Sequence, residues 1–119
     1  IIMLLSINNS KFKVKVLVSE KETQKGMMGK KFDKDFNGML FMMGGGENCF
    51  WMNNCVINLD IIFIQDGMIT KIHHNCPPCN DEFDCPSYCG NGNIVLEIEG
   101  GSCEILNIQA GDSIIYDLS

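Results

Sequence analysis

The sequence has 119 residues, 45% of them hydrophobic, which is enough for one folded domain spanning residues 1–119 with its own core. Its net charge of −6 and its lack of arginine argue against nucleic-acid binding, because phosphate and base recognition depend heavily on the bidentate guanidinium group. No apolar run approaches the roughly 18–20 residues of a membrane-spanning helix, so no membrane span is predicted.

The beginning of the chain bears on where the protein resides. Ile1 and Ile2 precede Met3, and the apolar run stops at Ser6, so the continuous apolar core of a secretory signal peptide is not visible. If Met3 is the native start, a cytoplasmic protein is expected, whereas removal of a leader would make it extracytoplasmic. Both alternatives stay open at this point.

The first predicted elements are a strand and a short helix. Residues 11–18 begin with a strict alternation of lysine and apolar side chains, which is typical of a half-buried strand. Ser19 and Glu22 then have the spacing of a capping box, in which each side chain binds the other residue's backbone N–H. They predict a helix over residues 20–28 that ends at Gly29.

The rest of the chain is predicted to be mainly β. Apolar and β-branched runs separated by glycine-rich or Asp-Gly turns predict strands at residues 38–43, 49–64 (one or two strands), 68–74, 94–98 and 113–118. A single helical turn is expected at 103–106. Residues 75–93 form a long loop, and loops of this length are uncommon unless they are functional or internally tied. The predicted fold is a single-domain β-sandwich or distorted barrel with one short helix in its N-terminal half and a cysteine-rich loop.

Seven cysteines are many for a chain of this length, and the odd number leaves at least one thiol unpaired. Four of them lie in the long loop as two close pairs: Cys76, Cys79, Cys85 and Cys89. Four thiolates can hold one tetrahedral zinc ion, and His74 in the preceding strand is a candidate additional ligand, so zinc is a candidate cofactor. The same spacing suits disulfides, reduced thiols or a redox dithiol in the Cys-Pro-Pro-Cys sequence, and these alternatives stay open.

Asp60 interrupts the apolar run of residues 49–64, where its carboxylate must be solvated, paired or hydrogen-bonded. In one interpretation it accepts backbone N–H groups and ties its strand to a neighbouring loop. In the other it belongs to a polar cleft next to the cysteine loop, with Trp51, Asn54 and Tyr88 as the other lining residues, and binds a small ligand. If the protein is an enzyme, Asp60 is the candidate acid–base catalyst.

A series of short motifs in order makes the chain resemble the family called Domain of Unknown Function 192, from about residue 14 to residue 118. The motifs are GMMG at 26–29, GMLF at 38–41, FWMNN at 50–54, LDIIFI at 59–64, Cys79, CPSY at 85–88, VLE at 95–97 and Gly111-Asp112. The resemblance implies a β-sandwich-like domain with a short helix and no established activity. It also implies that Cys79 and Cys85 are a pair, and Cys76 and Cys89 could form a second bridge outside that family pair. The chain departs from the family pattern at Asn53 and Cys55, where Lys and Thr are usual.

These features favour a non-catalytic binding or structural domain. Its shallow cleft, beside a cysteine loop stapled by disulfides or zinc, would take a small molecule or a peptide segment of a partner. The alternative is a metal-dependent enzyme that uses Asp60, followed by a redox or metal-handling module. Catalysis requires Asp60 to face a concave pocket, whereas a carboxylate fully occupied by backbone donors argues against it. The sequence does not define an oligomeric state.

Overall fold

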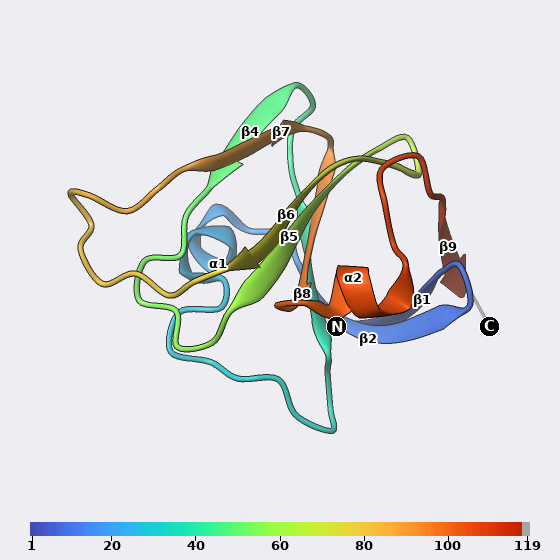
Figure 1. Ribbon diagram of the computed structural model, residues 1–119, viewed down its shortest axis with the longest axis horizontal. Helices are drawn as coiled ribbons and strands as arrows, with labels where there is room; N and C mark the ends of the chain where they lie inside the picture. The colour runs from blue at the N-terminus through green and yellow to red at the C-terminus, as the bar shows by residue number, and fades with distance from the viewer. Residues whose placement is uncertain (118–119) are drawn as a thin grey trace.

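The protein is described by a computed structural model over residues 1–117, and strands dominate it, as the sequence predicts. In chain order the elements are β1 (Ile2–Ile7), β2 (Ser10–Leu17), α1 (Glu20–Lys25), β3 (Gly38–Met42), β4 (Glu47–Phe50), β5 (Leu59–Gln65), β6 (Met68–Cys76), β7 (Tyr88–Asn91), β8 (Ile94–Glu99), α2 (Ser102–Leu106) and β9 (Ile114–Asp117) (Figure 1). Within these residues no helix is long and apolar enough to cross a membrane.

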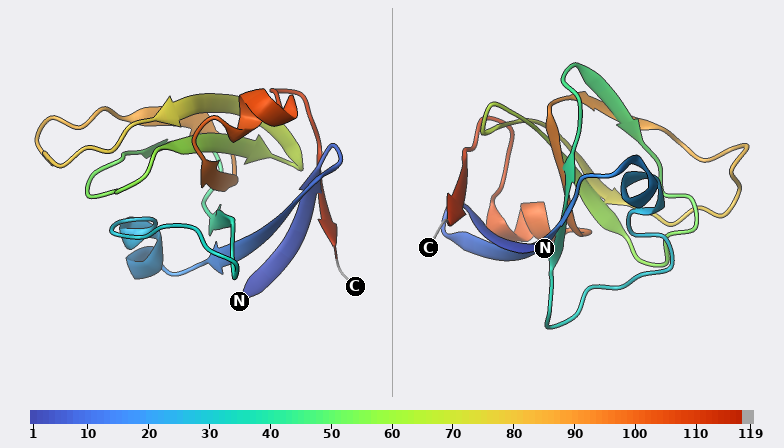
Figure 2. Two further views of the ribbon diagram at one scale, coloured as in Figure 1. Left: turned by 60° about the horizontal axis from the view of Figure 1, so that its bottom comes forward. Right: turned by 180° about the vertical axis from the view of Figure 1, so that it is seen from behind.

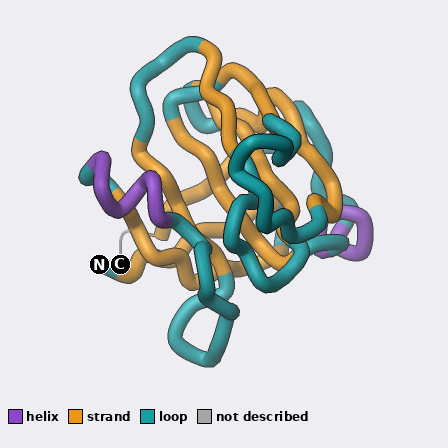
Figure 3. Tube along the Cα trace, turned by 90° about the vertical axis from the view of Figure 1, so that its left-hand side faces the viewer, coloured by secondary structure: helices purple, strands orange, loops and turns teal. Residues whose placement is uncertain are grey.

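Seven strands form one sheet in the order β6-β5-β8-β3-β2-β1-β9, and β4 and β7 pair as a small second sheet. β2 and β3 run parallel, with α1 in the connection between them, and the other paired strands are antiparallel. The large sheet curls, so that β5 and β6 lie across the molecule from the β1–β2 hairpin and α1 (Figure 2). The two helices lie on opposite sides of the body of strands (Figure 3). This half-barrel with a small added sheet agrees with the mainly β sandwich or distorted barrel predicted from the sequence.

The apolar side chains pack in two groups on opposite faces of the central strands. One group includes Leu40 and Leu96, and the other includes Phe41 and Val95. Because side chains alternate between faces along a strand, neighbouring residues of β3 and of β8 contribute to different groups. Both faces of β8 are therefore covered over residues 95–98, so Glu97, the polar residue in this stretch, is buried.

The short elements differ from the predicted ones in three places. α1 begins with the predicted capping box but ends at Lys25, because Gly26 takes a positive φ of 45° that stops the helix. β1 has no counterpart among the predicted strands, and β7 lies inside the predicted irregular loop. The last predicted strand corresponds to β9, and its final residue, Leu118, lies outside the described residues.

Candidate functional site

Asp60 has the structural role that one of the two interpretations gives it. Its side chain is fully buried, and its carboxylate accepts the backbone N–H groups of Asn75 (2.7 Å), Gly101 (3.0 Å) and Cys103 (2.8 Å). These bonds join β5 to the end of β6 and to the start of α2. With three main-chain donors and no place in the cleft described below, this carboxylate is arranged for holding the fold rather than for acid–base chemistry.

The cysteines form two disulfides, and one of them differs from the predicted pairing. Cys79 and Cys85 are bonded (S–S 2.14 Å), as the family resemblance implies. The second bridge suggested between Cys76 and Cys89 does not form, because Cys89 of β7 is bonded to Cys49 of β4 (S–S 2.10 Å), its direct partner in the strand register. Cys76 is a buried free thiol in the apolar group beneath the small sheet, so it is not available to the loop.

The predicted zinc set is not assembled, because three of its four sulfurs are bonded in two different disulfides. Within the described residues one group of metal-ligating side chains converges, Glu47, Cys49 and Cys89, whose ligand atoms lie within 4.8 Å of one another. Two of these three ligands are the sulfurs of a disulfide. His74 lies 3.9 Å from Glu104 and does not join the cysteines.

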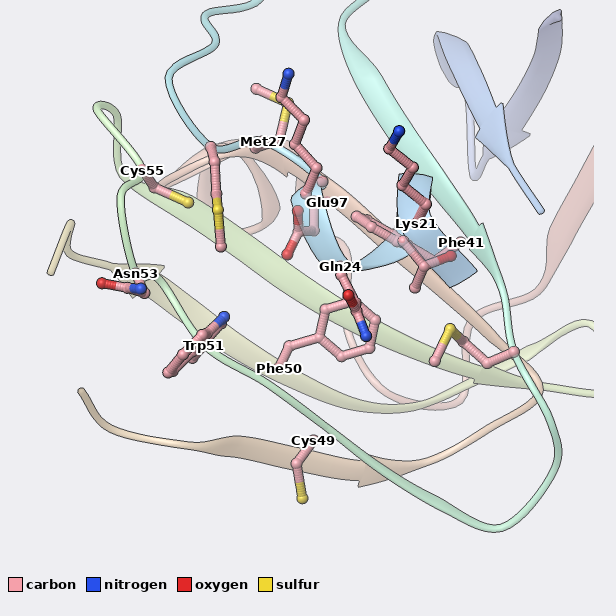
Figure 4. Close-up of a pocket in the computed structure, with 15 residues that line it drawn as sticks. Lys21, Gln24, Met27, Phe41, Cys49, Phe50, Trp51, Asn53, Cys55 and Glu97 are labelled. Carbon is pink, nitrogen blue, oxygen red and sulfur yellow. The ribbon is translucent and has the colours of Figure 1, made fainter. Parts of the chain in front are cut away.

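A cleft of about 700 Å³ opens between α1 and the segment 49–55 (Figure 4). Aromatic side chains from three places wall it: Phe41 of β3, Phe50 at the end of β4, and Trp51. Trp51 is 40% exposed although it is a large apolar residue. The polar groups toward the β8 side are Asn53, Cys55 and Glu97, and Lys21 and Lys25 of α1 stand at the margin.

The two disulfides hold the wall of this cleft that carries Trp51. Cys49–Cys89 fixes the strand that leads into it. Further along, the N–H of Asn54 donates to the carbonyl of Cys79 (2.7 Å), and the N–H of Cys79 donates to that of Met52 (3.1 Å), so the Cys79–Cys85 loop pins the segment after Trp51. The cysteine loop therefore positions the cleft without lining most of it.

Glu97 is the buried acidic residue that lines this cleft. It belongs to β8 in the middle of the large sheet and is only 3% exposed. Its side chain makes no hydrogen bond or ion pair with the described residues, and Figure 4 shows its carboxyl directed into the space between Cys55, Gln24 and Trp51. Burial raises its pKa from 4.5 to about 8. A buried carboxyl without a partner is costly to fold, and this one faces the cleft.

The thiol of Cys55, which lines the same cleft, is also partly buried. Burial, and secondarily the charge of Glu97, raise the pKa of Cys55 to about 11. Cys55 is therefore a neutral thiol near neutral pH and a weak nucleophile. Near neutral pH this thiol therefore adds no charge next to the carboxyl of Glu97.

The structure brings one of the predicted cleft residues to this site. Trp51 lines the cleft, but the adjacent amide that lines it is Asn53, since Asn54 takes a positive φ of 62° that turns the chain. Tyr88 lies on β7, with its ring centroid 5.4 Å from that of His73, and Asp60 is occupied elsewhere. Glu97 was not among the predicted site residues, although it is an acid within an apolar run just as Asp60 is.

Comparison with known proteins places the chain in a family. No curated protein matches it significantly. A protein of unknown function from Novosphingobium aromaticivorans has a similar crystal structure, with a TM-score of 0.83 and 30% identity over 95% of this chain and 84% of that one. A candidate transcription regulator from Sinorhizobium meliloti shares the fold, with a TM-score of 0.86 and 24% identity over 98% of this chain and 94% of that one. The model of the uncharacterized ACR family DUF192 matches residues 3–116, so the chain belongs to the DUF192 family.

Proposed function

We propose that the protein is a small-molecule-binding domain whose site is the cleft between α1 and segment 49–55, with Glu97 as its polar anchor. The observation that carries this proposal is the carboxyl of Glu97, which is buried, faces the cleft and has no partner among the described residues. Polar groups buried in folded proteins almost always have partners. A ligand that supplies the missing partner gives this exception a physical reason.

The walls of the cleft support the same function. Small-molecule sites are concave, mostly apolar, and contain a few converging polar groups. Here Phe41, Phe50 and Trp51 supply apolar contact area, and the volume of about 700 Å³ lies within the usual range for such sites. The disulfides hold the Trp51 segment before any ligand arrives, which lowers the ordering cost of binding.

Fragment binding followed by proton–nitrogen correlation NMR tests this function. The protein is titrated with a mixture of fragments that combine one aromatic ring with one polar group. We expect shifts confined to α1, segment 49–55 and the indole N–H of Trp51, and we expect Trp51→Ala to weaken them. Phe83→Ala is the matched control, because Phe83 is 92% exposed and does not line the cleft. Absence of shifts, or shifts centred elsewhere, would overturn the proposed function.

A further inference from the structure

The chemistry around Glu97 narrows the class of ligand. Lys21 and Lys25 line the margin of the cleft, yet neither forms an ion pair with Glu97 in the part of the chain that the structure describes. Figure 4 shows the amine of Lys21 turned away from the carboxyl. Lys30, the next cation along the chain, donates instead to the carbonyl of Gly26 (3.1 Å). Residues 1–117 thus supply no cation to this carboxyl, which leaves it free to pair with a cation from a ligand.

A metal ion is a poor candidate for that partner. Cations such as calcium or zinc need several ligands, and the converging group of metal-ligating side chains among the described residues does not include Glu97. The nearby thiol of Cys55 is held neutral, since its pKa is raised to about 11. One carboxylate beside a protonated thiol is a weak metal site.

An organic cation fits the remaining surface. The faces of aromatic rings carry negative electrostatic potential, so Phe41, Phe50 and Trp51 attract a cation and disfavour an anion. The net charge of −6 acts in the same direction. A carboxylate and an ammonium group form a charge-assisted hydrogen bond, which is stronger than one between neutral groups.

Resting on the proposed function, we propose that the cleft recognises small molecules carrying an organic ammonium group on an aromatic or apolar body. The ammonium nitrogen donates to the carboxylate of Glu97, and the body lies against the ring of Trp51. Asn53 is within the same cleft and can hydrogen-bond a further polar group of the ligand. The class is therefore protonated amines of aromatic or alkyl compounds rather than acids or alcohols.

The state of Glu97 links this binding to pH. Burial gives the free carboxyl a pKa of about 8, so near neutral pH most of it holds a proton. Binding of an ammonium group then releases that proton, and affinity falls as pH drops below about 8. The thiols of Cys55 and Cys76 also interact with Glu97, and burial raises the pKa of each to about 11, so neither adds a charge over this range. Lys21 and Lys25 of α1 line the same cleft.

The test is a titration of the fluorescence of Trp51, the single tryptophan of the chain, which reports on this cleft alone. The probes are phenethylamine, phenylethanol and phenylacetate, which share a ring and differ in their polar group. The proteins are the parent, Glu97→Gln, and Glu99→Gln as a matched control, since Glu99 is an exposed acid on the same strand. Circular dichroism verifies that each variant is folded.

We expect phenethylamine to bind at least about tenfold more tightly than phenylethanol at a pH above the pKa of Glu97. Glu97→Gln should lose that preference and its pH dependence, and Glu99→Gln should retain both. Equal binding of amine and alcohol, or tighter binding of phenylacetate, would overturn the ammonium assignment while leaving a small-molecule cleft. If no probe changes the fluorescence while neutral fragments bind in the NMR test, the ammonium assignment alone fails. Failure of the NMR test itself would remove the proposed function.

Discussion

Glu97→Gln should make the protein more stable, by an amount that depends on pH. Burial raises the pKa of Glu97 from 4.5 to about 8. Below the first value both the folded and the unfolded chain hold the proton, so the carboxyl contributes nothing. Between the two values the unfolded chain releases the proton while the folded protein retains it, and folding stability decreases by about 1.4 kcal/mol per pH unit.

The accumulated loss is about 3 kcal/mol near pH 7, and glutamine, which cannot ionise, escapes it. The parent and the variant should therefore be about equally stable near pH 4.5. Above that pH the variant should become progressively more stable than the parent. Urea unfolding followed by tryptophan fluorescence at a series of pH values measures the difference, with Glu99→Gln as the control that should show no such trend. A variant less stable than the parent at every pH would refute the reasoning, because it would mean that the carboxylate has a hydrogen-bonding partner in the folded protein.

The remaining predictions concern the framework around the cleft. Asp60→Ala leaves three backbone N–H groups without their acceptor, one of them buried and two part-buried, and should lower the free energy of unfolding by about 3 kcal/mol in urea titrations, whereas Asp84→Ala in the exposed loop should change it little. An equal effect of the two would contradict the structural role of Asp60. Gly90→Ala should cost about 1–3 kcal/mol, because its Cβ would lie 2.5 Å from the ring of Phe63, and Gly44→Ala, which meets nothing within 4 Å, should be tolerated. Intact-mass analysis of the unreduced, unfolded protein after alkylation should find three modified thiols, and seven would exclude both disulfides.

Local signals in the sequence predict local structure here. The capping box at Ser19 and Glu22 forms as expected, because both of its hydrogen bonds join residues three positions apart. The Asp66-Gly67 pair forms the tight hairpin turn between β5 and β6, with positive φ at both residues. The capping box and the hairpin turn each depend on a few neighbouring residues, so both can be predicted from the sequence without knowledge of the fold.

Long-range pairings were harder to foresee. Cys49 and Cys89 are separated by 40 residues and meet only because β4 pairs with β7. Cys76, which is closer to Cys89 in sequence, is drawn into the apolar group instead. Proximity in sequence was therefore a poor guide to the second disulfide, although the first, between Cys79 and Cys85, spans only six positions.

The position of Glu97 shows why the site itself was missed. Along β8, Glu97 and Glu99 alternate with Leu96 and Ile98, which is the pattern of a strand with one face in water. That pattern holds for Glu99 but not for Glu97, because α1 and segment 49–55 cover this part of the sheet. Burial of an acid by distant segments is a tertiary effect that periodicity along one strand does not report.

Carbon NMR of the Glu97 carboxyl across a pH titration tests the central claim most directly, with the signal assigned by its loss in Glu97→Gln. The free protein should show a pKa of about 8 for this group, and saturation with phenethylamine should lower it, because the bound ammonium stabilises the ionised carboxylate. A pKa near 4.5 in the free protein would contradict the account, since the carboxyl would then already be solvated or paired. A raised pKa that the amine leaves unchanged would contradict its binding at Glu97.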